Sequence, residues 1–237
     1  MTETTAVPTR LAYRLRINRP IPVEISATVG DVVHNLRAGL ECLAFELAQR
    51  SHVETLSSGQ QRASTFPICV TPEEFDRFIA RKDDLYNQPA VRALRSAQPF
   101  AIAEDARQRG VDMPNPSRGE ADFDELSQLN TIWNIDKHRR LALMNWWPDL
   151  YYWRSDGPSN RRMFPGDGTM KDGSILFYME GIDGNYDTEV MHQFNLALVD
   201  DPGFRHGQRD DVVSVVGRWY RKISSWVLPK IFGMMSQ

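Results

Sequence analysis

Residues 30–50, "GDVVHNLRAGLECLAFELAQR", carry the clearest helical pattern in the chain. Apolar residues recur there at steps of three and four, which predicts a helix with one face packed against a core. The expected stripe consists of Val33, Leu36, Leu40, Leu43 and Leu47. At 100° per residue, His34, Arg37 and Glu41 fall together on one flank of this stripe. That polar flank is either a solvated shoulder of the helix or the wall of a site.

The segment before this helix reads as a strand. Residues 10–18, "RLAYRLRIN", alternate apolar and polar side chains, the period of a half-buried strand whose exposed face is basic. Thr28, followed three residues later by Asp31, resembles a capping box and predicts that the helix begins near residue 28. A lone strand needs partners, so we expect it to pair with strands further along the chain.

Further helices are indicated by cap residues and prolines. Thr71 and Pro72 predict an N-cap and a first helical position, and Pro99 is expected to divide the helical residues 88–109. Residues 110–122 are rich in Pro, Gly and Asp and predict a loop, after which a helix is expected from about residue 122.

The C-terminal half is expected to contain a sheet and a last helix. Three aromatic or apolar segments within residues 145–199 predict strands that form a meander. Residues 209–228 predict a helix that starts with two aspartates and is stopped by Pro229. Its expected stripe is Val212, Val216, Trp219, Ile223 and Trp226.

Together these segments predict a single α+β domain over residues 1–237, in which a helical bundle packs with an antiparallel β-sheet and a C-terminal helix. Residues 28–144 are mainly helical, residues 10–18 and 145–199 form strands, and residues 209–228 form the last helix. The exposed side of this sheet and the last helix, which carries Trp219 and Trp226, favour self-association as a homodimer.

Composition restricts the class of protein. With 41% hydrophobic and 25% charged residues and a net charge of -3, the 237-residue chain has the balance of a soluble globular protein. Two cysteines without a Cys-x-x-Cys pair favour a reducing compartment. Neither a secretory signal nor a run of eighteen apolar residues is evident. We therefore expect a cytoplasmic protein that does not enter the membrane.

Common catalytic motifs are absent from the sequence. It contains no GxxxxGK[ST] phosphate loop, no GxSxG elbow and no HExxH helix. "DGNYDTE" begins like a calcium loop, but Thr188 and Phe194 stand where that loop needs glycine and glutamate, which favours a plain turn. A metal site using His34, Glu41 and His138 lacks a recognisable paired ligand spacing. No cofactor and no metal are expected.

Two histidine-bearing segments, with a short motif between them, resemble an uncharacterised family of bacterial proteins. That family carries "GDxxHNLRxxLDHLA", a downstream Phe-Pro-Ile and a later "IDKHR". This chain has "GDVVHNLRAGLECLA" at residues 30–44, "FPI" at 66–68 and "IDKHR" at 135–139. The resemblance covers roughly residues 10–145. Where the family tends to have Asp-His, this chain has Glu41 and Cys42.

The helical part is also loosely similar to HEPN domains, helical bundles that often act as metal-independent ribonucleases. The resemblance implies an arginine four to six residues before a histidine, which supplies a cation for the phosphate beside a general acid or base. No histidine of this chain has an arginine at that spacing. A HEPN-like site would therefore have to be rearranged here.

If the helix of residues 30–50 packs against the end of the helix that begins near residue 122, their polar residues meet. The candidate catalytic residues are His34, Arg37, Asp136 and His138, and the candidate ligand-binding residues are Asn35, Glu41 and Arg139. Asp136 would orient a histidine while the arginines bind an anion, which makes RNA or another anionic ligand the expected partner. The same residues could instead form a buried polar network that holds two helices together. A binding or accessory module and an enzyme acting on RNA or phosphate esters both remain open.

Overall fold

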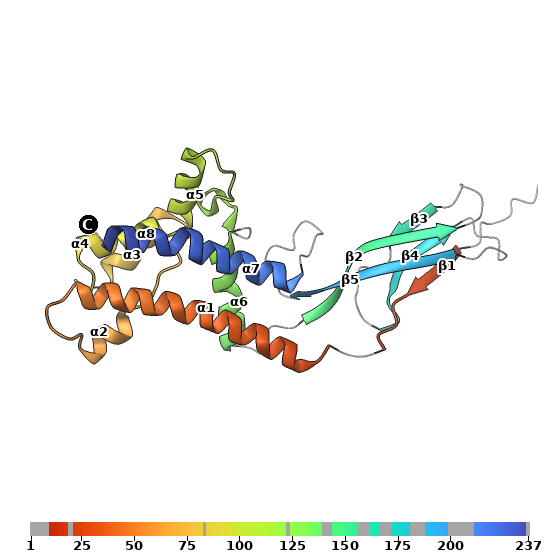
Figure 1. The fold of residues 1–237 in the computed structure, drawn as a ribbon, viewed down its shortest axis with the longest axis horizontal. Helices are drawn as coiled ribbons and strands as arrows, with labels where there is room; N and C mark the ends of the chain where they lie inside the picture. Colours follow the sequence, from red (N-terminus) through yellow and green to blue (C-terminus); the bar gives the residue numbers. More distant parts are fainter. Residues whose placement is uncertain are drawn as a thin grey trace, which may run out of the picture. The chain divides into compact units, whose positions relative to one another are not determined.

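The structure, a computed structural model, describes residues 10–18, 21–82, 84–121, 124–138, 144–155, 162–165, 172–180, 188–198 and 211–235 (Figure 1). Helices and strands both occur, which confirms the α+β class. Contacts group the chain into two compact units, one of residues 1–22 and 144–197 and the other of residues 23–143 and 198–237. We call them the strand unit and the helical unit. The single domain expected from the sequence stays a prediction.

The helical unit contains the long helices and their connections. Its elements are α1 (Val23–Arg50), α2 (Ser58–Ala63), α3 (Pro72–Ala80), α4 (Gln88–Ser96), α5 (Pro99–Gln108), η1 (Pro116–Arg118), α6 (Glu125–His138), α7 (Val212–Lys222), η4 (Ile223–Val227) and α8 (Leu228–Met235). α1 packs against α4, α6 and α7, and α8 packs against α4. The core of this unit is therefore built from segments up to two hundred residues apart in sequence.

α1 begins earlier than the sequence predicted. It starts at Val23, directly after Pro22, and Thr28 lies inside it. The Thr28 hydroxyl donates to the carbonyl oxygen of Glu24 at 2.8 Å, the bond a threonine makes within a helix and not at a cap. The predicted cap at Thr28 was wrong, because the helix already includes the preceding residues and the Thr28 hydroxyl bonds to one of their carbonyl groups.

The buried face of α1 is rotated slightly from the predicted stripe. Val33, Leu40 and Leu47 are buried as expected, whereas Leu36 and Leu43 are only half-buried. Arg37 and Ala44 lie inside instead. The core of the helical unit thus includes a charged residue, Arg37, which needs partners inside the protein.

Cap side chains and prolines mark where several other helices begin. Thr71 caps α3, its hydroxyl accepts from the backbone N–H of Glu74, and Pro72 occupies the first turn, as predicted. Pro99 begins α5 after α4 has ended, which confirms the predicted division. α6 begins at Glu125, where the Asp124 carboxylate accepts from the N–H of Ser127 at 2.9 Å.

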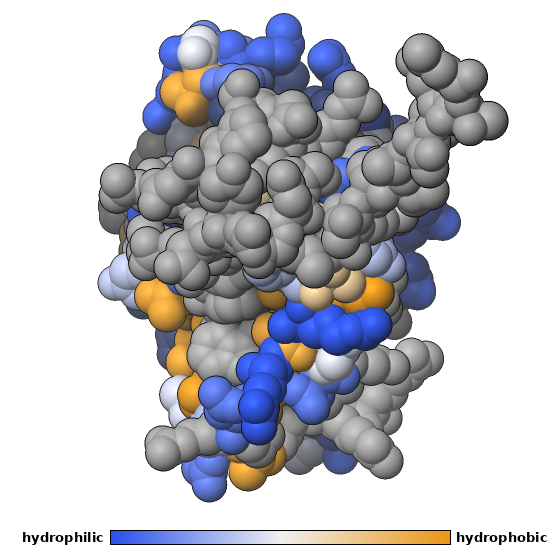
Figure 2. Space-filling model, turned by 90° about the vertical axis from the view of Figure 1, so that its right-hand side faces the viewer, coloured by the Kyte–Doolittle hydropathy of each residue, from blue (hydrophilic) through white to orange (hydrophobic). Residues whose placement is uncertain are grey.

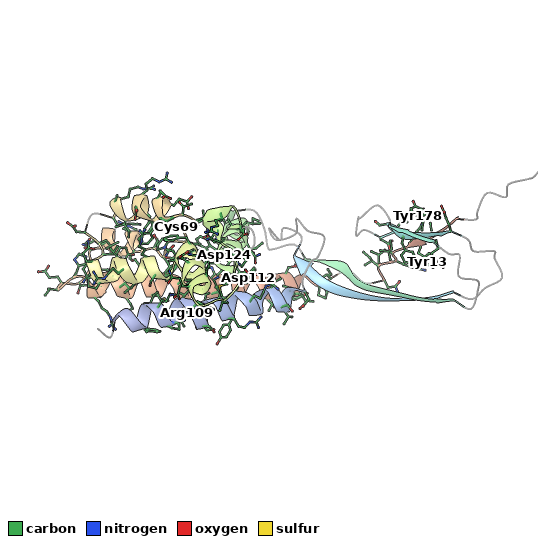
Figure 3. The ribbon with its side chains drawn as sticks, turned by 90° about the horizontal axis from the view of Figure 1, so that it is seen from above. Tyr13, Cys69, Arg109, Asp112, Asp124 and Tyr178 are labelled. Carbon is green, nitrogen blue, oxygen red and sulfur yellow. The ribbon has the colours of Figure 1, made fainter. Side chains whose placement is uncertain are left out.

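In the strand unit, the first strand is paired as the sequence required. β1 (Arg10–Arg14) pairs antiparallel with β4 (Ile175–Glu180), and β3 (Arg162–Pro165) pairs with the other edge of β4. The rings of Tyr13 and Phe177, directly opposite each other, stack with centres 4.7 Å apart. Figure 3 labels Tyr13 and its neighbour-strand residue Tyr178.

The predicted meander was wrong. β2 (Met144–Ser155) pairs with β5 (Thr188–Leu198) in a sheet of their own, and β4 belongs to the other sheet. The short strand β3 gave no clear signal in the sequence. Because β1 and β3 occupy both edges of β4, β4 has no free edge for β2 or β5, and those two strands satisfy each other.

The C-terminal helix does not stop at Pro229. α7 runs into a π-helical turn, η4, and helix continues through Pro229 to Met235 in α8. A proline ring crowds the carbonyl four residues earlier, here Ser225, and cannot bond to it. In the wider π turn the N–H of Leu228 bonds instead to Ile223, five residues back, so the helix accommodates the ring. The prediction that Pro229 ends the helix was wrong for this reason.

The buried face of the C-terminal helix also differs from the predicted stripe. Val212, Trp219 and Ile223 are buried as predicted, but Val216 and Trp226 are only half-buried, and Val215 and Val227 are buried instead.

On the face shown in Figure 2, hydrophobic described residues are interspersed with hydrophilic ones. No helix within the described residues is long and apolar enough to cross a membrane.

Candidate functional site

The polar flank of α1 divides into an exposed and a buried part. Arg37 and Glu41, one helical turn apart, form an ion pair with Nη2 and Oε1 2.8 Å apart. His34 and Asn35 are exposed. His34 lies about 60° further round the helix than Arg37, enough to turn it from the core to solvent. The structure therefore brings Arg37 and Glu41 together and leaves His34 on the surface.

Arg37 and Glu41 bind the main chain of Phe66. Nη2 of Arg37 donates to the Phe66 carbonyl at 2.8 Å, and the Phe66 N–H donates to Oε2 of Glu41 at 2.8 Å. Phe66 itself is 1% exposed. One ion pair thus satisfies both polar backbone groups of a buried residue, which links the "HNLR" and "FPI" segments physically.

Side chains from α3 and from the residues that follow α3 and α4 hold the end of α2 and the rest of the extended segment, residues 64–70. Nζ of Lys82 donates to the Ala63 carbonyl at 2.7 Å, and the Cys69 N–H donates to Gln98 at 3.0 Å. The Val70 N–H donates to Glu74 at 2.8 Å. Residues 64–70 form no strand. Without a sheet partner, their buried backbone groups depend on side chains.

Burial shifts the ionisation of groups around this segment. It lowers the pKa of Arg37, an effect that the Glu41 carboxylate opposes. Burial also lowers the pKa of Lys82 and raises that of the Tyr86 hydroxyl. Burial is the largest cause in all three cases, so the neutral form of each group is favoured relative to water.

Arg37 retains hydrogen-bonding capacity that the described residues do not use. It is 7% exposed, and its Nε and Nη1 atoms are buried without a hydrogen-bond partner among the described residues. Its Cζ atom lies 5.1 Å from the centre of the Trp133 ring on α6. Since a guanidinium carries five N–H donors, a buried one with unused donors can bind an acceptor that enters from outside.

The other predicted site residues lie at the end of α6. Asp136 and His138 belong to its last turn, but their side chains, and the whole of Arg139, lie outside the described part. The packing of α1 against α6 confirms that the two helices meet. Position 136 follows Trp133 by three residues, hence on the same side of α6. That His34 and His138 lie within about 10 Å stays a prediction.

The described residues offer little to a metal ion. No group of three or more His, Cys, Asp or Glu side chains is close enough to hold one, as far as the described part extends. Residues 183–187 of "DGNYDTE" lie outside the described residues, and Thr188 begins β5. The donors present around Arg37 are N–H groups, which bind anions and carbonyl oxygens.

Sequence reasoning missed the groups that Arg37 and Glu41 contact. It named neither the Phe66 main chain, nor Trp133, nor Lys82 as part of this cluster. The one available signal was the joint occurrence of "HNLR" and "FPI", which the structure explains as a contact. No protein-family model, curated protein or solved structure matches this chain.

Proposed function

We propose that the protein is a binding module that takes an anionic group between α1 and α6, with Arg37 as the principal donor. The observation that carries the proposal is the pair of buried Arg37 nitrogens, Nε and Nη1, without partners among the described residues. A buried N–H without an acceptor costs about 1–3 kcal/mol, so an acceptor from a ligand would recover that cost. Of the sequence-based candidates, Glu41 would hold Arg37 in place at this site and Arg139 stays a candidate donor. Asn35 is exposed, about 200° round α1 from Arg37, and would not face the same site.

Binding is favoured over catalysis because the buried cation and the histidine on the same helix face different sides of α1. Arg37 is fixed by Glu41 and Phe66, while His34 is exposed on the neighbouring flank. A general base must come within hydrogen-bond reach of the proton that it removes. The anion would be a carboxylate or a phosphate group, which guanidinium recognises through charge-assisted hydrogen bonds.

Nuclear magnetic resonance of arginine side chains tests the proposal directly. The Nε–H signal of Arg37, assigned with the Arg37→Lys variant, is followed while sodium phosphate or sodium acetate is added. We expect this signal to move downfield in a saturable way, because an anion becomes its acceptor. Signals of exposed Arg62 on α2 serve as the control for general ionic effects. A stationary Arg37 signal, or one that moves only in parallel with that of Arg62, rejects the binding site.

The second candidate is a HEPN-like ribonuclease or phosphate-ester enzyme that uses His34, Arg37, Asp136 and His138. It is favoured by the contact between α1 and α6, which brings the two helices of these residues together. Incubation with single-stranded RNA separates the candidates. Cleavage that is lost in His34→Ala and His138→Ala at unchanged melting temperature supports the enzyme, whereas intact RNA supports the binding module.

Self-association and a cytoplasmic location complete the proposal. Trp219 is 1% exposed and therefore belongs to the core instead of an interface. Val213 and Tyr220, seven residues apart on α7, are 76% and 62% exposed and offer an apolar strip to a second copy. Both cysteines are free thiols, which fits a reducing compartment. Light scattering that gives a monomer at micromolar concentration rejects the dimer.

A further inference from the structure

A polar hollow lies elsewhere in the helical unit and has no part in the proposal for Arg37. It is an open cavity of about 350 Å³ on one face of α7 and η4. Three cationic side chains line it, together with Glu125 at the start of α6 and Met113 from the preceding loop. The cations are Arg218, Arg221 and Lys222. Sites for small ligands begin at about this size.

The floor of this hollow is a buried ion-pair cluster. Nζ of Lys222 lies 3.1 Å from Oδ1 of Asp124 and 3.2 Å from Oε2 of Glu125. Lys222 is 3% exposed and Asp124, labelled in Figure 3, is fully buried. Two carboxylates offset the charge of Lys222, so this lysine is a structural part of the wall. The positive charge that a ligand can use comes from Arg221, which also lines the hollow.

The arginines are placed by helical periodicity. Arg218, Arg221 and Ser225 are separated by three and four residues and so follow one face of the helix. Arg221 is exposed, and no carboxylate in the described part of the chain pairs with its side chain. Ser225, also exposed, adds a hydroxyl. This face therefore presents a free guanidinium and a neutral donor to the same hollow.

Trp226 supplies a flat wall. Its ring lines the hollow and is half-buried, with Cζ of Arg109 5.9 Å from its centre. Both Ser225 and Trp226 belong to the π turn η4, which changes the spacing of side chains around the helix. Single π turns inside α-helices are frequent at functional sites.

We propose that this hollow binds small phosphate monoesters whose organic part is a flat ring. The phosphate would accept hydrogen bonds from Arg221 and from the Ser225 hydroxyl, and the ring would lie against Trp226. A phosphate group has three free oxygens for the donors on this face, whereas a carboxylate has only two. An indole ring favours contact with a flat apolar partner.

Phenyl phosphate is the probe that carries both parts, and inorganic phosphate and phenol each carry one. Binding is followed through the indole N–H signal of Trp226, assigned with Trp226→Phe. We expect phenyl phosphate to bind more tightly than either fragment. Arg221→Gln should weaken its binding by about tenfold, the effect of losing one charge-assisted hydrogen bond. Because Arg221 is exposed, the variant should keep its melting temperature.

Arg62→Gln is the matched control, since it makes the same change of charge at an exposed residue of α2. It should leave the affinity for phenyl phosphate unchanged. The proposal is overturned if the Trp226 signal does not move, or if both variants weaken binding equally. It is also overturned if phenyl phosphate moves only the Arg37 Nε–H signal, a result that would leave the Arg37 site standing. Conversely, a moving Trp226 signal with a stationary Arg37 signal supports this hollow alone.

Discussion

At the scale of single residues, Arg37 joins three parts of the helical unit. Its guanidinium pairs with Glu41, bonds to Phe66 and faces Trp133. A buried charge is stable only when it is paired and hydrogen-bonded. Arg37 therefore has a structural role in addition to the proposed binding role, and experiments on it must measure stability and binding separately.

Arg37→Gln should lower the free energy of unfolding by about 1–3 kcal/mol, because it removes a charged hydrogen-bond donor from Phe66 and from Glu41, whose side chain is 31% exposed. His34→Ala, on the exposed side of the same helix, should change it by less than about 0.5 kcal/mol. Urea unfolding of both variants measures the difference. Equal losses would show that His34 is also part of the packed interior.

The two cysteines should differ sharply in reactivity. Burial raises the pKa of the Cys69 thiol to about 11, with Glu74 as the next cause, whereas Cys42 is exposed. Since the thiolate is the reactive form, an aromatic disulfide reagent at pH 8 should modify Cys42 first, and Cys42→Ser should remove the fast phase. Two fast phases of equal rate would contradict this.

The raised pKa of Cys69 also affects stability. Because the pKa of Cys69 is higher in the folded chain, the buried neutral thiol contributes its full stability below the pKa of the unfolded chain, about 9. This stability is lost as the pH rises from about 9 to about 11. The unfolding free energy of Cys69→Ala should therefore fall less over this range than that of the unchanged chain. Equal slopes would show that other groups, such as Tyr86, dominate.

At the scale of one element, α7 begins at a carboxylate cap. Oδ1 of Asp211 accepts from the N–H of Ser214 at 3.0 Å. Hydrogen bonds from Ser214 hold the pKa of Asp211 below its usual range. A carboxylate at a helix start also interacts favourably with the helix dipole. The two aspartates in the sequence predicted an acidic start for this helix, and the structure adds that Asp211 is the N-cap.

Asp211→Ala should cost about 1 kcal/mol of stability at neutral pH, the typical value of an N-cap. Because the folded pKa is lowered, the contribution of Asp211 is present above its unfolded value and is lost as the pH falls. Asp211→Asn keeps an acceptor and should be nearly as stable, with a weaker dependence on acid pH. Unfolding free energies measured between neutral and acid pH test this, and identical pH profiles would exclude the cap as their cause.

At the scale of the whole molecule, ion pairs join segments far apart in the chain. Lys222 on α7 meets Asp124 and Glu125 at the start of α6, and Lys230 on α8 meets Asp105 on α5 at 2.7 Å. The pKa of Asp105 is lowered chiefly by its hydrogen bond from Lys230. The Lys222 cluster is buried, so its removal should matter most.

Lys222→Met should lower the free energy of unfolding by about 3–5 kcal/mol, because two carboxylates are left near each other without a cation. Adding Glu125→Gln removes one of these charges and should recover part of the loss. Thermal and urea unfolding of the two variants and of Glu125→Gln alone close a double-mutant cycle. A double variant less stable than the sum of the single losses would contradict the pairing.

Local patterns in the sequence determined the strand that begins at Arg10, the cap at Thr71, the acidic start of α7 and the division at Pro99, although the strand ends at Arg14 and not at residue 18. Each depends on backbone sterics and hydrogen bonds within a few residues, so the sequence alone is enough. The tertiary structure decided what distant segments do to each other. It paired β4 with β1 and β3, placed the Phe66 main chain on Arg37 and Glu41, and set Lys222 against Asp124. Such choices depend on which distant partner satisfies a buried polar group or a free strand edge, and no local pattern records that.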